Sequence, residues 1–104
     1  MGAPRLEQKG DGRYALAGDL VFGSVAALLP AGESAFGGRS PVEVDLRQVK
    51  RLDSAGLALL LEWSLAARAQ GREIRYRHAP PVLGTLAGMA GVDGLLATTA
   101  DEGA

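Results

Sequence analysis

The sequence has no cysteine, only one histidine and no long apolar run. Without cysteine, the chain can form neither a disulfide bridge nor a thiolate metal site, and thiol catalysis is excluded. No stretch approaches the roughly 18 apolar residues that a membrane-spanning helix needs, and the first residues lack the apolar core of a signal peptide. These absences predict a soluble, cytoplasmic protein that does not insert directly into a membrane.

The chain also has no large excess of positive or negative charge. Eleven Lys and Arg residues face twelve Asp and Glu residues, which gives a net charge of −1, and the basic residues are scattered along the chain. Electrostatics therefore gives no reason to expect a nucleic acid or an anionic membrane surface as the main partner. At 104 residues the chain is predicted to form a single domain, residues 1–104, with one hydrophobic core.

The central part of the chain predicts a strand followed by a helix. Residues 42–46 alternate apolar and polar side chains, as a half-buried strand does, and this strand should end near Arg47. After it, leucines recur at the three- and four-residue spacing of one helix face, namely Leu57, Leu60, Leu61 and Leu65. Asp53 and Ser54 are both good N-cap types, so the helix should begin at one of them.

The N-terminal part predicts a hairpin, a short helix and a long loop. Asp11-Gly12 lies between two alternating segments, residues 5–9 and 13–17, which is a strong hairpin signal. Residues 22–29 place apolar side chains on one helical face, and Pro30 should stop this helix. Residues 30–41 are rich in glycine and alanine with a proline at both ends, which predicts a flexible loop of unusual length, either a linker or a functional segment.

The C-terminal part predicts one more strand and one more helix. Gly71 should end the central helix, and residues 73–77 alternate as a strand. A third helix should begin at Pro80-Pro81 and end at Gly91, with residues 98–104 as a frayed tail. Strand, helix and strand in succession imply a parallel pair, so we expect an α/β fold: a small mixed sheet of about four strands with three or four helices.

Catalytic chemistry finds little support. His78 is the single histidine and has no cysteine or carboxylate at metal-ligand spacing. Asp19, Asp45 and Asp53 can converge at strand or helix ends, but turn and cap roles are the favoured interpretation. Ser54 has no evident base to activate it. The sequence therefore predicts no catalytic residue, no metal and no cofactor.

An apolar pair on the central helix suggests a binding surface. Leu59 and Trp63 lie four residues apart and outside the predicted core face, so they should form an exposed patch near Ser54. Tryptophan is enriched at interface hot spots. The alternative is that this pair packs beneath the long loop or the third helix. Arg51 can either pair with an acidic partner or remain solvated.

These residues resemble the STAS domain, the fold shared by anti-sigma-factor antagonists, sulfate-transporter tails and the MlaB component of Mla phospholipid transporters. The resemblance covers residues 16–96 and centres on Asp45-Leu46, Val49 and Leu52-Asp53-Ser54-Ala55-Gly56-Leu57. Within the family, the segment 57–63 and the later Pro80-Pro81, Leu86-Ala87 and Gly91-Val92 are most similar to MlaB.

The resemblance implies a non-catalytic protein-binding module. Its MlaB branch implies an accessory subunit that binds and tunes the ATPase of a phospholipid-transport ABC complex maintaining outer-membrane lipid asymmetry, at the inner face of the inner membrane. The alternative is an anti-sigma-factor antagonist whose Ser54 is phosphorylated by a partner serine kinase. In both cases the expected partner-binding residues are Arg51, Leu52, Asp53, Ser54, Ala55, Gly56, Leu59 and Trp63.

Overall fold

The computed structural model describes residues 3–99. Its sheet has five strands, which lie in space in the order of the sequence: β1 (Arg5–Gly10), β2 (Arg13–Leu20), β3 (Val42–Leu52), β4 (Ile74–Arg77) and β5 (Ala97–Thr99). The helices are α1 (Leu28–Phe36), α2 (Ser54–Ala69) and α3 (Pro81–Ala90), with a 3-10 turn at Asp93–Leu95. The α/β class is confirmed, with five strands where about four were expected.

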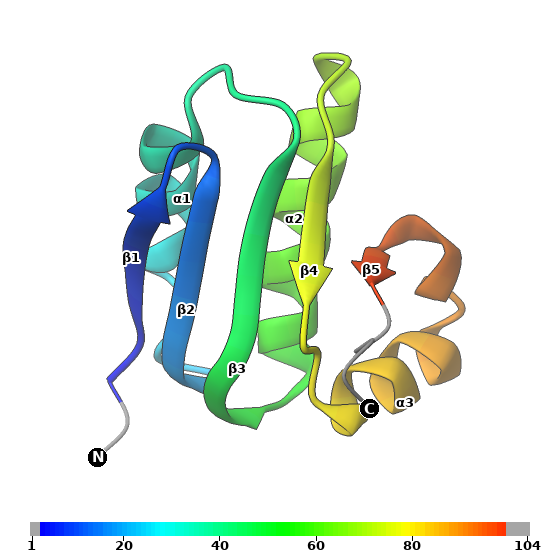
Figure 1. Cartoon of the computed structure of the whole chain (residues 1–104). Coiled ribbons are helices and arrows are strands. Elements are labelled where there is room, and N and C mark those ends of the chain that lie inside the picture. The colour runs from blue at the N-terminus through cyan, green and yellow to red at the C-terminus, as the bar shows by residue number, and fades with distance from the viewer. Residues whose placement is uncertain (1–2, 100–104) are drawn as a thin grey trace.

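The sheet is mixed and is covered by helices on one face. β1 and β2 pair antiparallel through the predicted hairpin, and the pairs β2–β3, β3–β4 and β4–β5 are parallel. Figure 1 shows α1 and α2 behind the sheet and α3 at its β5 edge. None of the described helices is long and apolar enough to cross a bilayer.

Alternation along the strands builds the core, as predicted. Val42, Val44 and Leu46 of β3 are buried against the helices, and Ile74 and Tyr76 of β4 continue the same layer. Their neighbours in sequence point to the uncovered face of the sheet because successive strand residues alternate sides.

Tyr76 carries a hydroxyl into this core. The hydroxyl donates a hydrogen bond to Leu60 O at 2.7 Å and accepts one from Ser64 Oγ at 3.4 Å, so the buried oxygen is satisfied. Burial raises the pKa of Tyr76 well above its ordinary value. The side chain therefore stays neutral within the core.

Strand β3 is longer than predicted. It ends at Leu52 and not near Arg47, and β2 likewise continues through Leu20. Two register shifts against β2, between Ala15 and Ala17 and between Gly18 and Asp19, place extra residues on β3. Such bulges interrupt the period of two, so the alternation that marks residues 42–46 no longer marks the rest of the strand.

The first helix lies later in the chain than predicted. The expected helix over 22–29 is wrong, and so is the expected loop over residues 30–36, because α1 spans Leu28–Phe36. Pro30 is in the first turn of α1, where a backbone N–H has no partner within the helix, so proline is tolerated there. Leu28, Gly32 and Phe36 recur every four residues and are the buried positions of α1.

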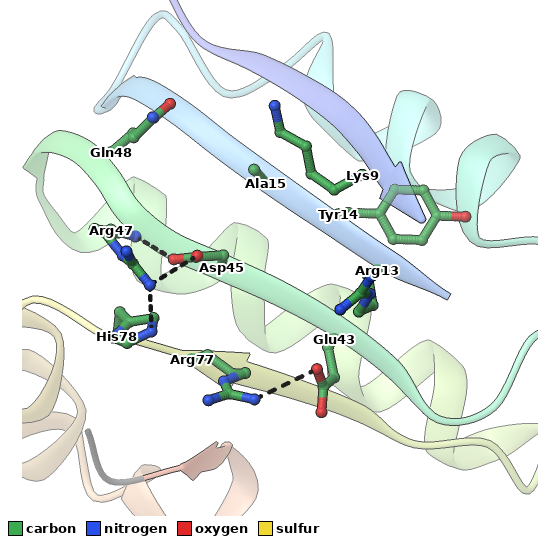
Figure 2. A pocket seen from close by; sticks show the side chains of 10 residues that line it. All are labelled: Lys9, Arg13, Tyr14, Ala15, Glu43, Asp45, Arg47, Gln48, Arg77 and His78. Carbon is green, nitrogen blue, oxygen red and sulfur yellow. Dashed lines mark hydrogen bonds and ion pairs between the residues drawn. The ribbon is translucent and has the colours of Figure 1, made fainter. Parts of the chain in front are cut away.

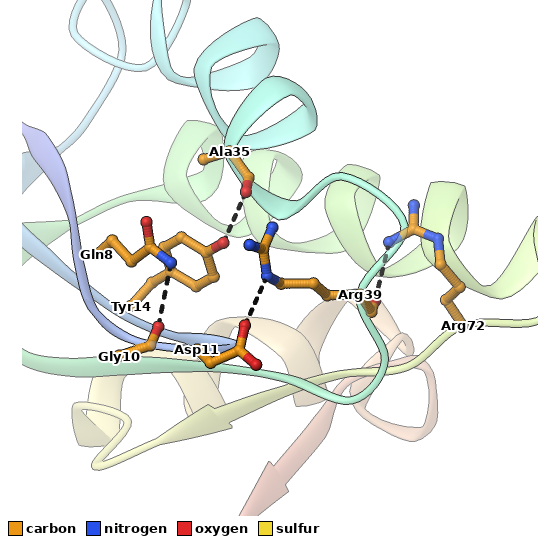
Figure 3. Close-up of polar contacts among 7 residues, drawn as sticks. All are labelled: Gln8, Gly10, Asp11, Tyr14, Ala35, Arg39 and Arg72. Carbon is orange, nitrogen blue, oxygen red and sulfur yellow. Dashed lines mark hydrogen bonds and ion pairs between the residues drawn. The ribbon is translucent and has the colours of Figure 1, made fainter.

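Polar contacts hold the remaining part of the predicted loop, residues 37–41. Arg39 Nε lies 3.1 Å from Asp11 Oδ1 at the hairpin, and Arg72 Nη1 donates to Arg39 O at 3.3 Å (Figure 3). Close by, the Tyr14 hydroxyl donates to Ala35 O at 2.6 Å. The first two contacts link the segment after α1 to the β1–β2 turn and to the segment before β4, and the third links α1 to β2.

The ends of α2 and α3 agree with the predictions, whereas β5 was not predicted. α2 ends before Gly71, whose φ of 72° is left-handed, and α3 ends before Gly91, with φ of 73°. Residues 98 and 99 belong to β5, so the predicted frayed tail does not begin at residue 98. The rest of that predicted tail, residues 100–104, lies outside the described residues.

Candidate functional site

The junction of β3 and α2 is built on the side chain of Asp53. Its Oδ1 accepts hydrogen bonds from Ala55 N at 2.9 Å and Gly56 N at 3.4 Å, which makes Asp53 the N-cap of α2. Of the two residues that the sequence offered for this role, Asp53 fills it, and Ser54 is the first residue of the helix. Two backbone donors that a helix start leaves unpaired are thereby satisfied.

Asp53 also holds the segment that follows β2. Its Oδ2 accepts a hydrogen bond from Phe22 N at 3.0 Å. This bond is the main cause that keeps the pKa of the Asp53 carboxyl below its ordinary value, and the bonds from Ala55 and Gly56 act in the same direction while burial opposes them. One ionised carboxylate therefore joins two segments of the chain.

Phe22 itself points to solvent. Its side chain is 89% exposed, more than any other large apolar side chain among residues 3–99. The turn around it is fixed, since Ser24 Oγ accepts from Val21 N at 3.1 Å and donates to Asp19 O at 2.8 Å. The structure therefore presents an exposed phenyl ring on a fixed turn beside the start of α2.

Gly56 allows the end of β2 to approach α2. A Cβ at this position would lie 2.4 Å from Leu20 O, and that same carbonyl accepts a hydrogen bond from Asp53 N at 3.2 Å. Any side chain here would push the strand and the helix apart. The glycine of the Asp-Ser-Ala-Gly segment thus has a packing role and is itself buried.

Ser54 is exposed at the start of α2. Further along the same helix face, Ala58 and Leu65 are exposed and Leu61 is half-buried. This face begins at Ser54, and Phe22 lies at the same end of α2 through its contact with Asp53. A hydroxyl here can be reached by a partner protein or by a kinase, and a phosphate at the N-terminus of a helix is electrostatically favoured.

The predicted exposed patch of Leu59 and Trp63 is wrong, because both side chains are buried, with 5% and 2% exposure. Trp63 Nε1 donates to Leu29 O at 3.2 Å, and its ring meets Phe36 edge to face at 5.1 Å between centroids. Helix α1 covers this side of α2, so the alternative prediction, packing beneath residues 30–41, describes it better, although part of that segment is helix and not loop. Leu65, assigned to the core from the sequence, is 39% exposed instead.

The other predicted site residues divide into accessible and buried ones. Arg51 is exposed at the end of β3, Ala55 is half-buried, and Leu52 and Gly56 are buried. Sequence reasoning missed Phe22 because a helical period placed it on a core face. The turn signal that contradicts that helix is Gly23, whose φ of 92° is left-handed.

The polar residues weighed for catalysis have other partners. Asp45 Oδ1 accepts from Arg47 N at 2.8 Å, and Asp53 caps α2. His78 has a left-handed φ of 55°, and its Nε2 lies 2.7 Å from Arg47 Nη2. Within residues 3–99, no group of three His, Cys, Asp or Glu side chains is placed to hold a metal ion.

Comparison with known proteins agrees with this architecture. A family model described as the MlaB type of STAS domain matches residues 6–97. No curated protein matches the chain. Among solved structures, the anti-sigma factor antagonist SpoIIAA in its unphosphorylated form is similar, with a TM-score of 0.70 at 16% identity, over 97% of this chain and 91% of that one. The Bacillus cell fate determinant SpoIIAA in its phosphorylated form matches with a TM-score of 0.63 at 15% identity, over 97% and 95%.

Proposed function

This chain belongs to the STAS domain family, and we propose that it is a non-catalytic, protein-binding accessory subunit that binds and tunes the ATPase of an Mla-type phospholipid-transport ABC complex. The family model that matches is the MlaB type, which supports the transporter branch of the family. In this role the chain would neither hydrolyse ATP nor contact lipid, and it would reach the inner membrane only through its partner.

The observation that carries the proposal is the surface around Ser54. Asp53 holds the backbone of Phe22, whose ring is exposed, next to the start of α2, where Ser54 and Ala58 are exposed. An apolar anchor beside small side chains offers a partner one protruding group and a surface that it can approach closely. We therefore propose a docking surface at Phe22, Arg51, Ser54, Ala58 and Leu65. Leu59 and Trp63 are buried and are left out of it.

A second candidate function is a phosphorylation switch. SpoIIAA has been seen in phosphorylated and unphosphorylated forms, and this chain shares its fold. Ser54 is exposed, so a kinase can reach its hydroxyl. Phosphate would add a charge of about −1.5 to −2 in the middle of the proposed docking surface and would change binding there. In this case the partner would be an anti-sigma factor with serine kinase activity.

The test is a pull-down from the native cell with tagged protein, followed by mass spectrometry of the bound partners and of Ser54. The variants are Phe22→Ala and Ser54→Asp. Met89→Ala is the control for the first, because Met89 is 80% exposed on α3, and Ser34→Asp is the control for the second, because Ser34 is exposed on α1.

Two results separate the candidates. Recovery of an ABC ATPase with its permease, weakened by Phe22→Ala and Ser54→Asp but not by the controls, supports the transporter subunit. Recovery of a serine kinase with phosphate on Ser54 supports the switch. If the ATPase is retained equally by all four variants, the docking surface lies elsewhere.

A further inference from the structure

The face of the sheet opposite α1 and α2 is uncovered in the described part of the chain (Figure 1). The alternation that buries Val42, Val44 and Leu46 sends Glu43 and Asp45 to this face. The same holds for other strand residues that alternate with core positions, such as Arg13 and Arg77.

A hollow of about 380 Å³ lies on this face across β1, β2, β3 and β4. Ala15 of β2 contributes to its lining and is only 8% exposed. Longer side chains rise from the strands on either side, so the small methyl group of Ala15 leaves a depression between them. Figure 2 shows Lys9 from β1 and Asp45 from β3 on opposite sides of Ala15. A hollow of this volume is within the range of small-molecule sites.

The charges around the hollow favour an anion. Its lining includes the cationic side chains of Lys9, Arg13, Arg47 and Arg77 against the carboxylates of Glu43 and Asp45. The lining thus has a surplus of positive charge, although the whole chain has a net charge of −1. Both carboxylates already have cationic neighbours, with Arg47 Nη2 at 3.6 Å from Asp45 Oδ2 and Arg77 Nη1 at 3.7 Å from Glu43 Oε1.

Arg13 takes part in neither of these two ion pairs. Within residues 3–99 it forms no ion pair with a carboxylate. Its guanidinium lies over Gly10 of β1, where a Cβ would be 3.1 Å from Arg13 Nε, so the group sits on the side of the hollow from which Lys9 comes. Lys9 is paired with Glu7 at 3.0 Å, and an exposed pair of this kind is weak enough to rearrange.

We infer that this hollow binds a small molecule that carries a carboxylate or phosphate group next to a hydroxyl or ammonium group. Arg13 and Lys9 would hold the anionic group, since guanidinium and ammonium donors form strong charge-assisted hydrogen bonds to such oxygens. The oxygens of Asp45 and Glu43 would accept from the neighbouring donor, which a simple anion lacks. The site is on the opposite face of the sheet from α2, and the inference does not depend on the proposed function.

The test is a titration of the isotope-labelled full chain at low salt, followed by the amide signals in nuclear magnetic resonance spectra. The probes are glycerol 3-phosphate and serine, which have an anionic group beside a donor, and inorganic phosphate and acetate, which have only the anion. We expect saturable shifts around Ala15 with glycerol 3-phosphate or with serine, and binding at least about tenfold weaker for the matching simple anion. Binding of glycerol 3-phosphate would identify the ligand as a phosphate compound, and binding of serine would identify it as a carboxylate compound.

Two variants assign the site. Arg13→Gln should weaken binding about tenfold or more, because a charge-assisted hydrogen bond is lost, whereas Arg68→Gln should leave it unchanged. Arg68 is an exposed cation on α2, so its replacement makes the same change in net charge away from the hollow. The inference is overturned if no probe gives saturable shifts up to about 20 mM. It is also overturned if the two variants behave alike, or if phosphate and acetate bind as tightly as the larger probes.

Discussion

The carboxylate of Asp53 reaches the backbone N–H of Phe22 across 31 positions of sequence, at 3.0 Å. The same side chain caps α2, so one residue sets both the start of the helix and the position of the Phe22 backbone beside it. The proposed docking surface therefore depends on a residue whose own side chain is only partly accessible.

Replacing Asp53 should separate its two roles. Asp53→Asn keeps one carbonyl oxygen for the cap but presents an amide nitrogen in place of the other oxygen, so Phe22 N loses its acceptor. Asp53→Ala loses both contacts. We expect a lower urea midpoint for Asn than for wild type and a still lower one for Ala, with faster hydrogen exchange at the Phe22 amide in both variants. Equal midpoints for Asn and Ala would contradict the division of roles.

Acid should remove the contribution of Asp53. The pKa of its carboxyl is below the ordinary value of 3.8 in the folded chain, so the ionised form stabilises the fold above about pH 4 and this stabilisation is lost as the pH falls through the folded pKa. The pKa values of Glu7 and Glu73 are also lowered and contribute to the same acid loss.

The comparison with Asp53→Asn isolates the aspartate, since both proteins keep Glu7 and Glu73. The stability difference between wild type and this variant should shrink between about pH 5 and pH 2. Urea unfolding at several pH values measures it. A difference that stays constant over this range would mean that the charge of Asp53 has no part in the cap.

Gly56 should tolerate no side chain. A Cβ there would meet Leu20 O at 2.4 Å, so Gly56→Ala should destabilise the fold by about 1–3 kcal/mol. Gly84→Ala is the matched control, because Gly84 lies within α3 with nothing within 4 Å of an added Cβ, and it should stabilise by about 0.5–1 kcal/mol. Chemical unfolding of both variants measures the change in the free energy of unfolding. If Gly56→Ala left it unchanged, β2 and α2 could move apart without loss of stability.

We expect Trp63 to contribute to the stability of the fold. Its replacement should affect partner binding only because the fold is destabilised. Its buried ring packs on Phe36, so Trp63→Ala should cost about 3–5 kcal/mol. Leu65→Ala on the same helix, where the side chain is 39% exposed, should change stability by no more than about 0.5 kcal/mol. If Trp63→Ala weakened partner binding while unfolding at the wild-type urea midpoint, the assignment of Trp63 to the core would be wrong.

The elements with a regular local pattern were predictable from the sequence. The hairpin at Asp11-Gly12, the start of α2 at Asp53, the alternation of β4 and the end of α3 at Gly91 each rest on a residue type or period that acts over a few positions. The helix start could be predicted to within one residue because Asp53 and Ser54 are both good N-cap types, but the sequence left the choice between them open. The other hydrogen bond of the Asp53 carboxylate, from Phe22 N, depends on tertiary structure, so no local sequence pattern predicts it.

Errors arose where distant segments override local signals. Pro30 predicts the end of a helix, yet in α1 it occupies the first turn, a position that only the location of the true helix start reveals. The sequence indicates a single apolar face on α2 and therefore predicts that Leu59 and Trp63 are exposed. That helix is buried on two sides, against the sheet and under α1, and Gly32 is what brings α1 close, since a Cβ there would collide with the Trp63 ring.

The order of the strands has a consequence for folding. Each strand of the sheet has its neighbour in sequence as its neighbour in space. A chain that emerges from the ribosome can therefore complete each strand pair, with its connecting helix, before the next strand has been synthesised, and no strand must be inserted between two that are already paired. Synthesis and assembly can proceed in the same direction, from the hairpin to β5.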